Sequence, residues 1–68
     1  MIEIFGIKYI TEKEASQRYA YSESWFRLQR KHKLCPKYTR IGVKKRGRVY
    51  YPLDATDHWF KMQLEMNS

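Results

Sequence analysis

The stretch ITEKEASQRYAYSESWFRLQRKHKLCP, residues 10 to 36, decides the fold of this 68-residue chain. Thr11 and Glu14 have the spacing of a capping box, in which each side chain binds a free backbone N–H of the first helical turn. We therefore expect a first helix over residues 12–19. Ala15 and Tyr19, four residues apart, lie on one side of that helix and are expected to face the core.

A second helix is expected over residues 23–33. Ser22 is a favourable N-cap, and Glu23 places a negative charge in the first turn, where the helix dipole favours it. Pro36 ends the segment because it lacks an N–H and disfavours helical backbone at the preceding residue. One side of the helix is expected to face the core with Trp25, Leu28 and His32. The other side is expected to project Arg27, Arg30 and Lys31, with Phe26 between the two sides.

Two short helices separated by three residues have the outline of a helix-turn-helix. A helix in the major groove of DNA needs arginine for guanine edges, small hydrogen-bonding side chains for other edges and lysine for phosphates. The second expected helix contains all three types. Its candidate DNA-binding residues are Ser22, Ser24, Arg27, Arg30 and Lys31.

A β-hairpin is expected over residues 38–51, with strands over 38–43 and 48–51. Gly47 is expected to take the left-handed conformation that a turn with a bulge requires. The cations at its tip repel one another, and a bound polyanion would relieve that repulsion. We therefore expect a wing that contacts DNA, with candidate residues Arg40, Lys44, Lys45, Arg46 and Arg48.

A last helix is expected over residues 54–66, with Asp54 as its N-cap. Its core stripe is expected to contain Trp59, Met62 and Met66, and Phe60 and Leu64 widen the apolar side enough to indicate contact with a second protein. Residues 1–9 leave two alternatives open, a short strand pairing with the later hairpin or an irregular apolar lead-in. The expected fold is a small α+β winged helix-turn-helix, a single domain over residues 1–68 in which the two-stranded wing and a C-terminal helix follow the helix-turn-helix.

The charge of the chain is concentrated in its middle. The formal net charge is +7, and ten of the fourteen Lys and Arg residues fall between Arg27 and Arg48. No Asp or Glu lies between Glu23 and Asp54. A folded surface with one sign of charge attracts polyanions, of which nucleic acid is the commonest. The alternative is a solvated face that only promotes solubility.

Catalysis, cofactor binding and membrane insertion are not expected. His32 and His58 lack serine or cysteine partners at the spacing of a nucleophilic site. His32 and Cys35 form half of a zinc site, and no second pair completes four ligands. The single cysteine allows no internal disulfide, and no run approaches the roughly 20 apolar residues that span a bilayer. We expect a cytoplasmic protein that is not an enzyme.

The order of these segments resembles the excisionase and AlpA-like family of small winged-helix DNA-binding proteins, which are relatives of the MerR-type DNA-binding domain. The resemblance covers about residues 10–60. It rests on Ile10 to Ala15, Ser22 to Pro36, Ile41-Gly42, Arg48 to Tyr51 and Asp54 to Phe60. In the turn between the two helices, where the family often has glycine, this chain has Ala20 and Tyr21.

The resemblance implies a DNA-binding accessory factor of phages and other mobile elements. Excisionases are recombination directionality factors, which bind repeated sites, bend the DNA and help a site-specific recombinase to favour excision. AlpA-like relatives instead regulate transcription. The implied partners are double-stranded DNA, a site-specific recombinase (integrase) and adjacent copies of the same protein on DNA, with no membrane and no small-molecule substrate. The residues implied to contact DNA are Ser24, Arg27, Arg30 and Lys31 on the recognition helix and Lys44, Lys45, Arg46 and Arg48 on the wing.

Two other classes of function stay open. Six tyrosines beside a cationic groove are also typical of proteins that bind RNA or single strands by stacking. Exposure of Tyr38 and Tyr50 on one hairpin face would favour that class, whereas the helix-turn-helix spacing counts against it. A protein-interaction module that uses Phe60 and Leu64 is compatible with DNA binding.

Overall fold

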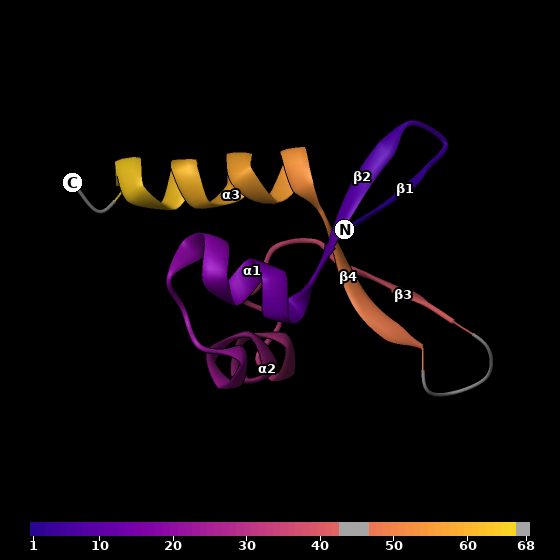
Figure 1. Ribbon diagram of the computed structural model, residues 1–68. Coiled ribbons are helices and arrows are strands. Elements are labelled where there is room, and N and C mark those ends of the chain that lie inside the picture. The colour runs from indigo at the N-terminus through magenta and orange to yellow at the C-terminus, as the bar shows by residue number, and fades with distance from the viewer. Residues whose placement is uncertain (43–46, 67–68) are drawn as a thin grey trace.

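The computed structural model describes residues 1–42 and 47–66. In this part of the chain three helices pack beside a four-stranded antiparallel sheet with the strand order β1-β2-β4-β3, so the protein is α+β (Figure 1). The elements in chain order are β1 Ile2–Ile4, β2 Ile7–Thr11, α1 Glu12–Tyr19, α2 Glu23–Lys31, β3 Thr39–Ile41, β4 Arg48–Pro52 and α3 Leu53–Met66.

The order of elements differs from the expected one, because a hairpin precedes the helices. Ile4 pairs with Ile7, and the two residues between them, Phe5 and Gly6, both have positive φ angles of 51° and 78°. Two-residue turns of this kind match the twist of the strands they join. The second strand, β2, then pairs with β4 in the middle of the sheet, so the strand alternative for residues 1–9 is correct.

Helix α1 forms where the sequence predicts it. The Glu14 backbone N–H donates to Thr11 Oγ1 at 3.1 Å, and the Thr11 N–H donates to Glu14 Oε1 at 3.0 Å, which completes the capping box. The helix ends at Ala20, whose backbone is left-handed with φ 61°. Glycine is the usual residue in this conformation, so the sequence gives no glycine signal for the end of this helix.

Helix α2 begins as expected and ends two residues early. The Trp25 backbone N–H donates to Ser22 Oγ at 3.0 Å, which confirms the N-cap. At the other end Lys33 has a φ of 57°, and the N–H groups of Lys33 and Leu34 donate to the carbonyls of Arg30 and Gln29. This pair of bonds is a Schellman motif. The motif ends the helix at Lys31, so Pro36 is not the residue that terminates it.

The core contains Ile10, Ala15, Phe26, Val49, Tyr51 and Phe60. The expected core stripe of α2 is wrong, because Phe26 is fully buried whereas Leu28 is 50% exposed and His32 is exposed. Successive helical residues are 100° apart, so Leu28 lies about 200° from Phe26 and cannot share its side. Trp25 does pack against the core, from a partly buried position.

The buried stripe of α3 also differs from the expected one. Thr56 and Phe60 are buried, whereas Met62 and Met66 are exposed. The helix begins at Leu53, directly after the last residue of β4, so Asp54 lies in the first turn and is not the N-cap. The choice of stripe is decided by the sheet and by Tyr19, whose ring stacks on Phe60 with centroids 4.1 Å apart.

The hairpin that the sequence predicts as a wing is formed by β3 and β4, whose register pairs Thr39 with Tyr50 and Ile41 with Arg48. Strand β3 is shorter than the range 38–43 that we expected. Within this hairpin Gly42 has a positive φ, at 152°. The turn in which Gly47 was expected to be left-handed involves residues outside the described part of the chain. Val43, Lys44, Lys45 and Arg46 lie outside the described residues.

Candidate nucleic-acid interface

The outward side of α2 carries most of the residues predicted to contact DNA. Ser24, Arg27 and Lys31 are exposed, and the Arg27 side chain keeps 67% of its surface accessible. These residues fall within one arc because positions 24, 27 and 31 are separated by three, four and seven residues. Ser22 lies at the start of the same helix, where its hydroxyl oxygen is used as the N-cap.

Arg30 does not project with the other cations. Its Nη1 forms an ion pair with Glu12 Oε2 and donates a hydrogen bond to the Tyr51 hydroxyl at 3.3 Å. Its guanidinium also lies over the ring of Tyr38, 5.8 Å from the centroid. The side chain is only 14% exposed. Arg30 therefore ties α2 to α1 and β4, and it is not positioned to reach the edges of bases.

Glu12 is the partner that sequence reasoning missed. Its carboxylate, 15% exposed, accepts from Arg30 and from the Tyr51 hydroxyl at 3.3 Å, and lies 4.0 Å from Arg27 Nε. Burial raises the pKa of the Tyr51 hydroxyl to about 12, partly opposed by the positive charge of Arg30. The sequence gives no local signal for this cluster, because Glu12, Arg30 and Tyr51 come from three elements that are far apart in the chain.

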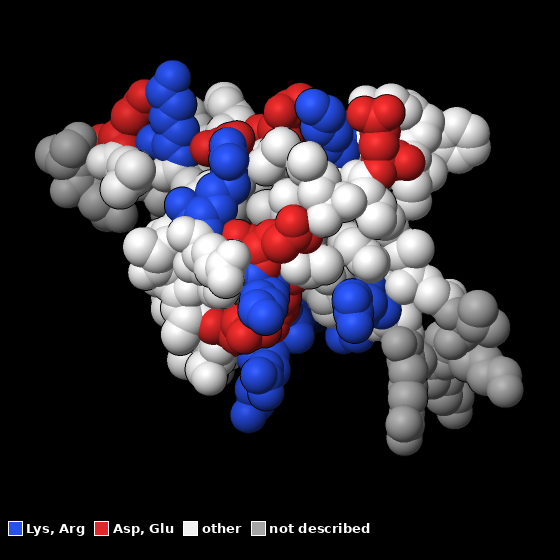
Figure 2. All heavy atoms as spheres, in the orientation of Figure 1, with Lys and Arg blue, Asp and Glu red and all other residues white. Residues whose placement is uncertain are grey.

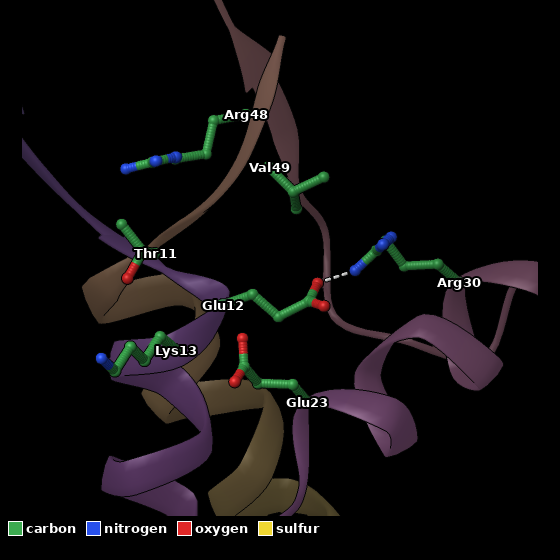
Figure 3. A pocket seen from close by; sticks show the side chains of 7 residues that line it. All are labelled: Thr11, Glu12, Lys13, Glu23, Arg30, Arg48 and Val49. Carbon is green, nitrogen blue, oxygen red and sulfur yellow. Dashed lines mark ion pairs between the residues drawn. The ribbon is translucent and has the colours of Figure 1, made fainter. Parts of the chain in front are cut away.

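A hollow of about 400 Å³ lies beside this cluster, between the start of α1, α2 and β4 (Figure 3). Arg48 and Lys13 extend to the same side of the hollow, whereas the carboxylate of Glu23 points toward Glu12. Its lining residues are Thr11, Glu12, Lys13, Glu23, Arg30, Arg48 and Val49. The hollow is open to solvent. Because Glu12 and Arg30 are paired with each other, we assign this region to the packing of α1, α2 and β4 and not to a ligand site. Among the described residues no three His, Cys, Asp or Glu side chains gather as metal ligands would.

The wing strands add two exposed arginines to the interface. Arg48 is the first residue of β4 and pairs with Ile41, and Arg40 donates from Nη1 to the Gly47 carbonyl at 3.5 Å. Between the strands Gly42 and Gly47 approach closely, since a Cβ on Gly42 would lie 2.9 Å from the Gly47 Cα. The other predicted wing residues, Lys44, Lys45 and Arg46, lie outside the described part of the chain.

The charged side chains are unevenly distributed over the surface. Figure 2 shows Lys and Arg side chains projecting along the lower edge of the molecule, over α2 and beside the wing strands. The upper and middle parts of the same view carry most of the Asp and Glu side chains, interspersed with further Lys and Arg side chains. The side that carries α2 and the wing is therefore the one that would attract a polyanion.

The side of α1 that faces α3 is fixed by polar contacts between these two helices. Arg18 donates two hydrogen bonds of 2.8 Å to the Asp57 carboxylate, and the Tyr19 hydroxyl donates a third at 2.5 Å. The bonds from Arg18 hold the pKa of Asp57 below its ordinary value, although burial opposes this. These contacts orient α1 against α3, so they are assigned to the fold and not to the interface.

A groove of about 550 Å³ lies between the α1–α2 pair and α3, and it is lined by aromatic side chains. Tyr21 stacks on Trp25 with ring centroids 4.2 Å apart. Phe60 is buried beneath the groove, whereas Leu64 at its edge is 70% exposed. Phe60 and Leu64 were the two residues predicted to contact a second protein. Of these, only Leu64 is accessible.

Cys35 shows no sign of a reactive thiol. It is partly buried just after α2, and burial raises the pKa of its thiol. A raised pKa lowers the thiolate fraction, which is the nucleophilic and metal-binding form.

The chain matches no family model, no curated protein and no solved structure. Among the described residues no helix is long and apolar enough to cross a membrane. The inference of function therefore rests on the residues and their arrangement.

Proposed function

We propose that this protein binds double-stranded DNA in a sequence-specific manner as a small winged helix-turn-helix, with α2 in the major groove and the β3–β4 wing on the adjacent backbone or minor groove. The observation that carries the proposal is the cationic surface along the lower edge of the molecule in Figure 2, to which α2 and the β3–β4 strands both contribute. Its described cations are Arg27, Lys31, Arg40 and Arg48, all exposed. A bound polyanion would compensate this gathering of like charges.

The dimensions of an α-helix are compatible with this placement. With its side chains a helix is about 10–12 Å in diameter, and the major groove is about 12 Å wide. Arg27 is the proposed base-reading arginine, Ser24 a second contact to base edges, and Lys31 a contact to phosphate. The sequence pattern also predicts a DNA contact for Arg30. Because its charge is paired with Glu12, we instead assign Arg30 to fixing α2 against α1.

The finer role that we propose is that of an excisionase-like directionality factor of a mobile element, acting in the cytoplasm of a prokaryotic host. It would bind repeated sites next to an attachment site, together with a site-specific recombinase or adjacent copies of itself. An AlpA-like transcriptional regulator would use the same DNA surface. Excision and reporter assays on the selected site separate the two roles, because only the first requires a recombinase.

The rival class, stacking of single strands on tyrosines, is not favoured by the described side chains. Tyr51 is buried, and Tyr38, although 37% exposed, is packed against both Tyr51 and the Arg30 guanidinium. Tyr50 is partly buried in the middle of β4, opposite Thr39 and Thr11. The part of the hairpin that the structure describes therefore offers no row of free rings beside the cations.

The proposal is tested by selecting bound sequences from a random duplex library at near-physiological salt, with matched single-stranded DNA and RNA as competitors. We expect a short enriched motif and preference for the duplex. The variant Arg27→Ala/Lys31→Ala should lose this binding. The control Lys8→Ala/Lys61→Ala removes the same charge from exposed positions outside α2 and the wing, and should retain it. Equal binding of single strands, or equal loss in both variants, would overturn the proposal.

A further inference from the structure

One side chain on the outward side of α2 is chemically unlike its neighbours. Leu28 is 50% exposed, in the middle of a helix whose other outward residues are polar or charged. At 100° per residue, Ser24, Arg27, Leu28 and Lys31 fall within an arc of about 100°. Leu28 therefore belongs to the surface that we assign to DNA, and not to the core.

An isolated exposed leucine needs no explanation by itself. The position of Leu28 is informative because it is surrounded by the residues proposed to contact DNA, so it loses water when they bind. Placing an aliphatic side chain against a phosphate or a polar base edge would remove hydrogen bonds to water without replacing them. The C5-methyl group of thymine is the apolar group that base edges present in the major groove.

We infer that Leu28 packs against the methyl group of a thymine and thereby selects a T·A pair at one position of the binding site. This inference rests on the proposed function, and it specifies one base pair of the DNA that the site prefers. A leucine in this position adds selectivity that Arg27 cannot supply, because arginine is suited to guanine.

The test replaces each thymine of the selected duplex, one at a time, by deoxyuridine. Uracil pairs with adenine as thymine does and lacks only the C5-methyl group. Burial of one such carbon is worth about a fourfold change in affinity. We therefore expect one position at which the substitution weakens binding of the unaltered protein about fourfold.

The matched variants are Leu28→Ala and Leu64→Ala. Both remove an exposed helical leucine, but Leu64 is on α3, on the other side of α1 from α2 in Figure 1. Leu28→Ala should bind the thymine and deoxyuridine duplexes equally, whereas Leu64→Ala should still discriminate about fourfold. Both variants should unfold at the same urea concentration as the unaltered chain, which shows that folding is not the cause.

The outcomes distinguish the two proposals. A selected motif without thymine, a thymine scan without effect, or discrimination that persists in Leu28→Ala would overturn the leucine–thymine contact and leave sequence-specific binding intact. Failure of the first selection to yield any duplex motif would instead overturn the proposed function, and the inference about Leu28 with it.

Discussion

The two sides of helix α2 use the same kinds of residue for different purposes. On the inward side Phe26 is buried and Arg30 is paired with Glu12, whereas on the outward side Leu28 is half exposed and Arg27 projects into solvent. An aromatic or aliphatic residue and an arginine occur on both sides. What distinguishes them is the tertiary environment, so stability and binding should respond to different substitutions.

The largest difference should appear between Phe26→Ala and Leu28→Ala. Truncating the buried ring should lower the free energy of unfolding by about 3–5 kcal/mol, which is most of the stability of a chain this small. Truncating Leu28 should change it by about 0.5 kcal/mol or less. Urea denaturation followed by circular dichroism measures both. Comparable losses would mean that Leu28 is packed and that the two sides are not distinct.

The pair Glu12 and Arg30 should matter for stability and not for reading DNA. Glu12→Gln should lower the free energy of unfolding by about 2–3 kcal/mol, because it leaves a poorly solvated guanidinium without its counter-charge. Glu23→Gln is the control, since Glu23 lines the same hollow but is exposed, and should change stability by about 0.5 kcal/mol or less. If the two substitutions had equal effects in thermal or urea unfolding, the pairing of Glu12 with Arg30 would not contribute specifically to stability.

Arg27 should show the reverse behaviour. Arg27→Ala should weaken binding to the selected duplex by about 1–3 kcal/mol and relax the preference at one base pair. Its effect on unfolding should be small, because the guanidinium is mostly exposed and 4.0 Å from Glu12. Competition binding against single-base variants measures the preference. If Arg27→Lys bound every variant as the unaltered chain does, base recognition by the arginine would be wrong.

The proposed roles of α2 and of the wing in DNA binding can be compared through the dependence of affinity on salt concentration. Replacing Lys44 and Lys45 by alanine should weaken binding to all duplexes alike and should reduce the slope of log affinity against log salt concentration by about 1 for each phosphate that these lysines neutralise. The replacement should leave base preference unchanged. Titrations at several salt concentrations measure the slope, and a slope equal to that of the unaltered chain would exclude a contact between these lysines and phosphate.

The smallest effect concerns acid stability and lies away from both sides of α2. The pKa of Asp57 is lowered in the folded state, so its contacts with Arg18 and Tyr19 stabilise the fold above the ordinary carboxyl pKa of about 3.9. That contribution is lost as the pH falls through the lowered pKa. The gap in urea midpoint between the unaltered chain and Asp57→Asn should therefore narrow from pH 6 to pH 3. A constant gap would show that the charge of Asp57 is not involved.

Local signals in the sequence identified the helices, strands β3 and β4 and the inward side of α1, where Ala15 is buried and Tyr19 packs against the core. They did not identify the inward sides of α2 and α3. The capping box of Thr11 and Glu14 and the N-cap Ser22 act within one helical turn, so they could be recognised from spacing alone. The end of α2 was missed because Lys33, rather than glycine, takes the left-handed position. The N-terminal hairpin stayed open for a similar reason, since Phe5 is an unusual residue at a positive φ.

Long-range contacts account for the remaining errors. Helical spacing allowed Trp25 and Leu28 to share a stripe, and only packing against β4 and α3 shows that Phe26 takes the central position. In the same way Arg30 matched the pattern of an outward cation, because its partner Glu12 lies in another helix. Spacing predicts which residues share a side, whereas the choice of buried side depends on elements far away in the chain.

The close approach of Gly42 and Gly47 limits how the wing can diversify. A side chain at Gly42 would collide with backbone on the opposite strand, and its φ of 152° disfavours other residues as well. A library randomised over residues 42 to 47 and selected for folding should retain glycine at position 42. Retention of glycine at this position would then report on the folding of the hairpin and not on what the hairpin binds.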